Sequence, residues 1–183
     1  MSLHARSNAS SSNSDATHTS TAKIVSTPSQ IPPGYCLLFV TVEVGAEKKI
    51  YSIRKDLLVF YSDYFRAAFN GSFAEATERK ISLLQERVDV FNVFNKFIYT
   101  RCLSDETDTE ISWELLIRVW LFGDRHLIPA LQNHVMNTMI EKSAKEKVIP
   151  NQHLNLIYKN TLIGSPLRKI LVDWIAYETD MPD

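Results

Sequence analysis

Residues 50–103 read IYSIRKDLLVFYSDYFRAAFNGSFAEATERKISLLQERVDVFNVFNKFIYTRCL, and this stretch decides the fold. It consists almost wholly of apolar residues at regular spacings, separated by residues that favour turns. No arrangement of side chains in it resembles a catalytic site. One short surface motif, Phe73-Ala74-Glu75, interrupts the apolar pattern. The stretch therefore predicts a scaffold that holds other groups in place.

The spacing of the apolar residues predicts helices and one strand inside this stretch. Two short helices follow residue 56, the second capped by Ser62-Asp63 and stopped by Asn70-Gly71. Residues 80–84 predict a strand. Residues 89–100 predict an amphipathic helix with an aromatic face. The apolar residues at helical spacing are Leu57, Leu58, Tyr61, Tyr64, Phe65, Ala68 and Phe69, followed by Val90, Phe91, Val93, Phe94, Phe97 and Ile98.

On the N-terminal side, residues 35–44 are aromatic and β-branched and predict a strand. A turn over residues 45–48 returns the chain into a second strand over residues 49–53. Residues 1–34 are rich in Ser, Thr and Asn, so we expect a disordered tail there.

On the C-terminal side, the acidic residues 104–110 predict a loop, and residues 142–147 predict a charged linker. Four further helices are expected over residues 111–122, 129–141, 152–160 and 166–177. Three strands cannot cover so many apolar helical faces, so the helices must also pack on one another. The expected class is α+β and mainly helical: a small three-stranded sheet against helical hairpins, with extra C-terminal helices.

Composition excludes several classes of function. Lys and Arg number 20 and Asp and Glu 21, so the formal charge of −1 provides no field for nucleic acid or an anionic membrane. Cys36 and Cys102 form neither a disulfide framework nor a metal clip. The N-terminus has no secretory signal, and the longest misleading apolar run, residues 36–42, is too short to span a bilayer. We expect an intracellular protein in the cytoplasm or nucleus.

Three motifs give the chain a resemblance to the BTB/POZ domain, in particular to the stand-alone BTB proteins of filamentous fungi. The family's F-x-V-H-K-x-L-L-x-x-x-S-x-Y-F pattern is similar to residues 51–65. Its F-x-x-F-x-x-F-I-Y-T-G segment is similar to residues 91–101, and its A-D-x-x-x-I-x-x-L-x-N element to residues 123–133. The likeness runs over residues 37–140. It divides the chain into a tail (1–34), a BTB/POZ-like domain (35–141) and a C-terminal helical extension (142–183).

The resemblance implies a protein-interaction module without catalytic activity. Many BTB domains form homodimers, and many dock onto the cullin scaffold of ubiquitin ligases as substrate adaptors. Others recruit corepressors beside a DNA-binding zinc-finger region or assemble potassium-channel tetramers. The expected partners are therefore proteins, a second copy or a cullin scaffold among them, and not nucleic acid or membrane.

Phe73-Ala74-Glu75 lies where cullin-binding members carry a hydrophobic-x-Glu motif. An aromatic side chain can fill an apolar pocket while a carboxylate at the rim fixes its register. Phe73, Glu75 and the nearby Phe69 are thus the candidate docking residues. The alternative is that Phe73 packs under the loop and Glu75 merely caps or solvates it.

A dimer would use the helices of residues 57–69, where Val59, Phe60 and Tyr61 can exceed the needs of the core. The alternative is that all three belong to the core. Arg54-Lys55 stands where the family has His-Lys, but residues 35–44 contain no Asp to pair with it. The charged pocket of the transcriptional members is therefore not expected.

No enzymatic site is predicted. His126 and His134 have no Cys or carboxylate partners in the sequence pattern and make a poor metal site. Motifs for a serine nucleophile, a zinc protease or a phosphate loop do not occur. We expect no cofactor and no metal. The alternative to a cullin adaptor is a self-associating scaffold or transcription-linked regulator with no ubiquitin role.

Overall fold

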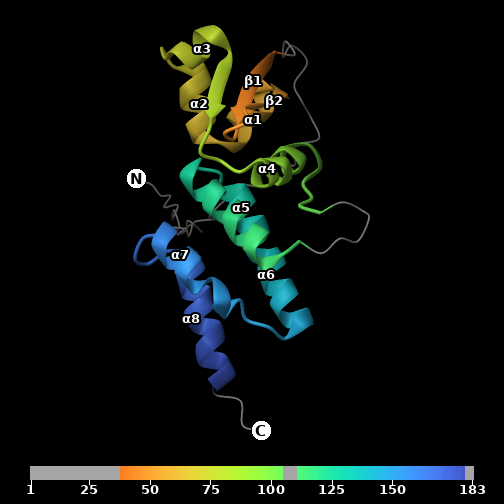
Figure 1. The fold of residues 1–183 in the computed structure, drawn as a ribbon, viewed down its shortest axis with the longest axis vertical. Coiled ribbons are helices and arrows are strands. Elements are labelled where there is room, and N and C mark those ends of the chain that lie inside the picture. Colours follow the sequence, from red (N-terminus) through yellow and green to blue (C-terminus); the bar gives the residue numbers. More distant parts are fainter. Residues whose placement is uncertain (1–37, 105–110, 180–183) are drawn as a thin grey trace, which may run out of the picture. The chain divides into compact units, whose positions relative to one another are not determined.

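The computed structural model describes residues 38–104 and 111–179. Within these ranges the strands β1, β2 and β3 and the helices α1 to α8 follow the predicted order except for α3, which was not predicted, and the α+β, mainly helical class is confirmed (Figure 1). The expected tail and most of the expected acidic loop lie outside the described residues. The elements are β1 (Phe39–Val44), β2 (Lys49–Arg54), α1 (Lys55–Tyr61), α2 (Asp63–Asn70), α3 (Ala74–Glu78), β3 (Lys80–Leu83), α4 (Val88–Thr100), α5 (Trp113–Arg125), α6 (Pro129–Glu146), η1 (Asn151–His153), α7 (Leu154–Asn160) and α8 (Pro166–Thr179).

The sheet has the order β2-β1-β3, with β1 antiparallel to β2 and parallel to β3. Gly45, with φ +76°, begins the hairpin turn in a backbone conformation that favours glycine. Val40, Val42 and Val44 alternate along β1 and are at most 2% exposed, because they form the sheet face that the helices cover. The predicted hairpin is thus present.

An aromatic cluster fills the core between α2, α4 and α5. Phe94 of α4 lies at its centre, with ring centroids 6.0 Å from Phe65, 5.5 Å from Phe91 and 5.1 Å from Phe122. All four rings are fully buried. The spacing of three and four residues that predicts α4 is therefore the spacing that brings Phe91 and Phe94 onto one buried face.

The hairpin of α5 and α6 holds the N-terminus of α2. The Ser62 hydroxyl accepts a hydrogen bond from the Phe65 amide, as a helix cap, and donates one to the His126 carbonyl at 2.6 Å. Pro129 occupies the first turn of α6, as predicted. Gly123 lets the two helices approach closely, since a Cβ there would lie 2.9 Å from Cγ of Gln132.

The predicted charged linker over residues 142–147 is wrong. Residues 142–146 continue α6 without a break, and only Lys147 leaves the helical conformation. Lys142 pairs with Glu146 one turn later, and the indole nitrogen of Trp113 donates to Glu146 at 2.9 Å. The ion pair lies within α6 itself. The Trp113 contact comes from α5, so the sequence pattern of α6 alone could not reveal it.

The C-terminal helices α7 and α8 pack on the rest of the described chain through few side chains. Ile157, Leu167 and Leu171 are fully buried. The rings of Trp113 and Trp174 meet edge to face at 6.3 Å. Both helices match the predicted positions within a few residues. Among the described helices, none has the length and apolar character that crossing a membrane requires.

Candidate protein-interaction surface

The Phe73-Ala74-Glu75 motif lies at a sharp turn between two helices. Helix α2 ends at Asn70, and Phe73 is the residue that precedes the single-turn helix α3. The Phe73 side chain is 60% exposed, although it stands at an ordered helix start. Glu75 lies in the first turn of α3 and is half-buried. The motif therefore presents an aromatic ring to solvent with a carboxylate beside it.

Gly71 makes this turn possible through close approach. A Cβ at Gly71 would lie 2.6 Å from the carbonyl oxygen of Ala67 and 3.0 Å from Cδ2 of Phe73. The φ of Gly71 is ordinary, −83°, so the requirement is for space rather than for a special conformation. The Phe73 ring can lie close to the end of α2 because this position has no side chain.

Tyr64 of α2 extends the surface. It is 36% exposed, and its ring packs against Phe65 and, at 4.9 Å, against His126. Burial raises the pKa of the Tyr64 hydroxyl first, and the carboxylates of Glu75 and Glu86 raise it further. Tyr64 thus lies within the electrostatic reach of Glu75. We call Tyr64, Phe73 and Glu75 the docking face.

Phe69 does not belong to the docking face. Its side chain is 2% exposed and its ring stacks on Phe65 at 6.4 Å. The ammonium of Lys55 donates to the Phe69 carbonyl at 2.8 Å, which ties the end of α2 to the start of α1. Because the Phe69 side chain is buried, it is not available to a partner, contrary to the prediction. Its place one turn after Phe65 is the signal that assigns it to the core.

Of the three residues expected at a dimer interface, only Phe60 is exposed, at 56%. Tyr61 is 6% exposed, 5.7 Å from the Phe97 ring and beneath the guanidinium of Arg101. Val59 is half-buried, and its carbonyl accepts two hydrogen bonds from Arg66. A surface that recruits a second copy at α1 would therefore depend on the Phe60 side chain.

The basic pair Arg54-Lys55 is occupied within the chain. Arg54 forms an ion pair with Asp56, two residues along the chain. Lys55 binds the end of α2, as described above. The absence of an Asp in β1 is thus matched by an Asp in α1 that takes Arg54 instead, a pairing that the sequence analysis did not anticipate.

The two histidines lie against aromatic rings. His126 is 5% exposed, and its Nδ1 lies 3.0 Å from the Phe122 carbonyl. Burial lowers the pKa of His126 below its ordinary value. His134 packs on the Phe97 ring. Among the described residues, no three His, Cys, Asp or Glu side chains gather closely enough to hold a metal ion.

Helix α3 and Leu127 are surface features that the sequence analysis missed. The sequence of α3, AEATE, favours helix but is too short to show a period. Leu127 is 54% exposed beside the start of α2, where its carbonyl accepts the Asp63 amide at 3.4 Å. Its φ of 51° places it in a left-handed turn that no residue pattern indicates.

Residues 36–143 match the family model of the BTB/POZ domain. Two solved structures are similar to the chain, each with 16% sequence identity and a TM-score of 0.43: the BTB (Tramtrack and Bric a brac) domain of human Gigaxonin and the BTB domain of zebrafish PATZ1. The match with Gigaxonin covers 54% of this chain and 74% of the Gigaxonin structure. The match with PATZ1 covers 56% of this chain and 75% of the PATZ1 structure. No curated protein matches the chain. The family match alone spans more than half of the 183 residues.

Proposed function

The chain belongs to the BTB/POZ domain family of protein–protein interaction modules, and from this premise we propose that it is an adaptor that docks onto a cullin scaffold. Its docking face would contribute Phe73 as the inserted side chain and Glu75 as the polar contact at the rim. The bound cullin would belong to a ubiquitin ligase. The narrower likeness to stand-alone fungal members and the intracellular location stay predictions, as do the boundaries at residues 34 and 141.

The observation that supports this proposal is the exposure of Phe73. An aromatic side chain at 60% exposure leaves apolar surface in water, which costs about 25 cal/mol per Å² compared with burial. Phe73 keeps this exposure at the fixed start of α3, so its ring is presented rather than tucked under the loop. Preorganised aromatic side chains of this kind are frequent centres of binding energy at interfaces.

Glu75 complements Phe73 through its position. It lies in the first turn of α3, where a carboxylate is favoured by the helix N-terminus and is held close to the ring. A partial burial leaves one side of Glu75 available to a donor from a partner. Charged groups at a rim contribute mainly to specificity and association rate, so Phe73 should dominate the affinity.

The experiment measures binding of the full chain to a purified cullin N-terminal domain by calorimetry. We expect Phe73→Ala/Glu75→Ala to weaken binding by a factor of about 30 or more, the loss of a central interface residue. Phe60→Ala is the matched control, because Phe60 is 56% exposed but lies on α1. Equal binding by wild type and the double variant would overturn the adaptor proposal.

A second candidate function is self-association through α1, favoured by the exposure of Phe60. Light scattering measures the mass of wild type and of Phe60→Ala. A wild-type dimer that Phe60→Ala converts to a monomer, while Phe73→Ala does not, would support this function. A wild-type monomer at high concentration, or a dimer unaffected by Phe60→Ala, would contradict it.

A further inference from the structure

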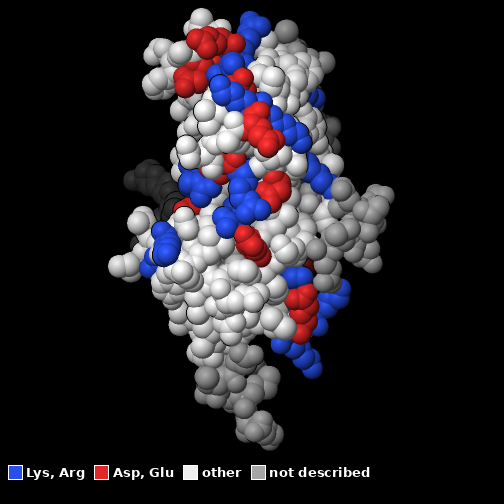
Figure 2. All heavy atoms as spheres, viewed as in Figure 1, with Lys and Arg blue, Asp and Glu red and all other residues white. Residues whose placement is uncertain are grey.

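A hollow of about 80 Å³ lies between α5, the loop that joins β3 to α4, and helix α7. Its charged lining consists of Arg87, Arg118, Arg125 and Glu86, three positive groups against one negative. Apolar side chains, Leu156 among them, complete the lining. We call this feature the arginine hollow. Figure 2 shows Lys and Arg interleaved with Asp and Glu around the middle of this face, over α5.

The arginine hollow is shared between the family domain and the C-terminal helices. The three arginines lie within residues 36–143, which match the family. Leu156 and Asn160 of α7 lie beyond them and form the opposite wall. Packing of α7 on the domain therefore creates the hollow. None of its lining residues belongs to the docking face.

Two of the three arginines are neutralised by bidentate ion pairs. Arg87 donates to Asp89 through Nε at 3.0 Å and Nη2 at 2.6 Å. Arg125 donates to Glu86 through Nε at 3.0 Å and Nη2 at 2.7 Å. A guanidinium that is paired with both oxygens of a carboxylate has its positive charge compensated, although part of its five N–H donors stays open. The ion pairs of Arg87 and Arg125 fix the positions of these two side chains in the lining of the hollow.

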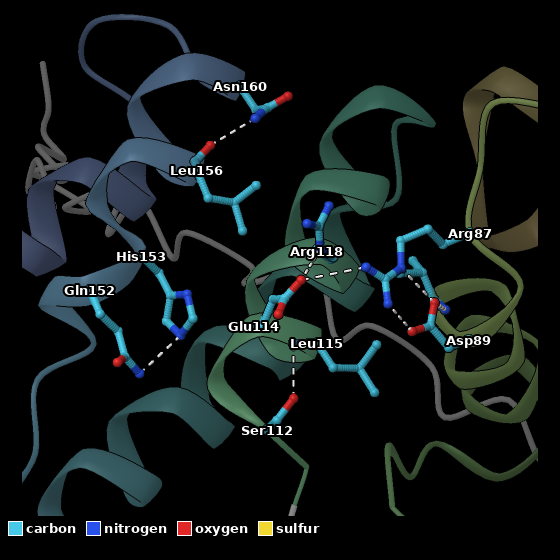
Figure 3. Close-up of polar contacts among 11 residues, drawn as sticks. Arg87, Asp89, Ser112, Glu114, Leu115, Arg118, Gln152, His153, Leu156 and Asn160 are labelled. Atoms are coloured by element: carbon cyan, nitrogen blue, oxygen red, sulfur yellow. Dashed lines mark hydrogen bonds and ion pairs between the residues drawn. The ribbon is translucent and has the colours of Figure 1, made fainter.

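Arg118 differs from these two arginines, because neither of its two Nη groups has a partner among the described residues. Only its Nε is engaged, donating to Glu114 at 2.8 Å (Figure 3). Within the described part of the chain, Nη1 and Nη2 of Arg118 make no hydrogen bond or ion pair. The Arg118 side chain is 32% exposed, so these four N–H donors are within reach of a ligand.

Glu114 cannot satisfy Arg118 fully, because two arginines share it. Its Oε1 accepts both from Arg118 and, at 3.4 Å, from Arg87. In Figure 3 the Glu114 carboxylate lies between these two guanidinium groups. The pKa of Glu114 is held below its ordinary value, first by the hydrogen bond from Arg118. Glu114 stays ionised and competes with any second carboxylate for the same cation.

We propose that the arginine hollow binds a carboxylate side chain from an acidic segment of a partner protein, with Nη1 and Nη2 of Arg118 as the donors. The planar fork of arginine matches the two oxygens of a carboxylate. A water occupies roughly 10–15 Å³ of such space, so the hollow admits a group of several heavy atoms, about one short side chain. The apolar wall at Leu156 limits competition from water.

The charge distribution favours an acidic peptide over nucleic acid. A nucleic-acid surface needs a track of unpaired cations to follow successive phosphates. Asp89, Glu114 and Glu86 instead form ion pairs with the arginines of the hollow, so no such track exists here. A carboxylate can bind at one point, because both Nη groups of Arg118 have no partner among the described residues.

The test uses a fluorescein-labelled hexaglutamate peptide and measures fluorescence anisotropy on the full chain at low ionic strength, with hexaglutamine as the neutral peptide. We expect Arg118→Gln to weaken hexaglutamate binding about tenfold, the loss of a charged hydrogen-bonded pair. Arg118→Lys keeps the positive charge but not the planar guanidinium, so its affinity for hexaglutamate should lie between those of wild type and Arg118→Gln. Arg66→Gln, which removes a guanidinium paired with Asp63 on α2, should leave binding unchanged.

Glu114→Gln provides the opposite test. Glu114→Gln removes the charge that competes for Arg118, so hexaglutamate should bind more tightly than to wild type. The proposal is overturned if hexaglutamate fails to bind, if Arg118→Gln binds it as well as wild type, or if Glu114→Gln weakens it. It is also overturned if oligothymidylate binds more tightly than hexaglutamate through Arg118. Circular dichroism confirms folding, and Glu114→Gln decides the outcome if Arg118→Gln does not fold.

Discussion

The aromatic core of α2, α4 and α5 and the C-terminal pair of α7 and α8 represent two ways of holding helices. In the core, Phe94 meets three other buried rings from three helices. In the C-terminal pair, Leu162 and Ile163 are 86% and 95% exposed between the two helices. The core is therefore stabilised by many mutual contacts between buried rings. The pair of α7 and α8 is held by a few buried side chains and leaves apolar side chains exposed to water. The comparison separates residues that make the fold from residues that are free to make contacts.

The largest effect is expected in the core. Phe94→Ala removes a ring that is fully buried among three others, and no neighbour can fill the space without leaving its own contacts. We expect a loss of about 3–5 kcal/mol in the free energy of unfolding, measured by urea denaturation. A loss below about 1 kcal/mol would contradict the central place of Phe94.

A smaller and local effect is expected from Trp174→Ala in α8. This substitution removes the edge-to-face contact with Trp113 and part of an apolar side chain. The cost should be about 1–2 kcal/mol, confined to the C-terminal pair. Hydrogen exchange would show faster exchange in α7 and α8 and unchanged exchange in α4. Equally faster hydrogen exchange in α4 and in the C-terminal pair would contradict the claim that the two regions are stabilised separately.

The pH dependence of stability tests the core at His126. Its folded pKa lies below the ordinary value of 6.5, so the unfolded chain takes up a proton first as the pH falls. Stability from this group is therefore complete above pH 6.5 and is lost progressively below it. Glu86, with Oε1 4.0 Å from Nε2, opposes the shift, and Arg125 adds to it.

The comparison for this prediction is His126→Gln. It should show a flatter fall in the free energy of unfolding between neutral pH and pH 5, whatever its stability at neutral pH. Asp89, whose pKa is lowered by Arg87, titrates from its ordinary value of 3.8 downwards and contributes equally to both proteins. Identical slopes in the two proteins would show that His126 does not titrate differently on folding.

The smallest effect is expected at the tip between α7 and α8. Ile163→Ser replaces a side chain that is 95% exposed, so the free energy of unfolding should change by less than about 0.5 kcal/mol. Leu167→Ser, four residues later but fully buried, is the contrasting variant and should be clearly destabilising. Urea denaturation of both measures the contrast. Similar losses would mean that the tip is part of the core.

The fold could be predicted where periodicity and burial coincide. The strand β1 and the helices α2 and α4 carry their buried residues at spacings of two or of three and four, which are the repeats of a strand and of a helix. The last turn of α6 could not be predicted, because its support comes from Trp113 on another helix. Helix α3 could not be predicted for the opposite reason, since a single turn is too short to show a period.

The candidate site could be predicted only in part. The position of Phe73 and Glu75 follows from the motif, but their exposure does not. Phe69 and Phe73 are both aromatic residues near the end of α2, yet one is 2% and the other 60% exposed. The Asn70-Gly71 stop distinguishes the two, because Phe69 lies inside α2, one turn after Phe65, and Phe73 lies beyond its end. The open fork of Arg118 depends on three carboxylates and three arginines from separate segments, which no local pattern reveals.

The unbroken course of α6 has a consequence for which changes in chain length the protein can tolerate. Lys142 and Glu146 face Trp113 only because a fixed number of residues separates them from the start of α6. One residue inserted between Pro129 and Lys142 would turn both side chains by about 100° around the helix axis. Helix α8 would then lose the orientation that brings Trp174 to Trp113. Insertions and deletions are therefore not tolerated inside α6, and homologous sequences should differ in length in other segments.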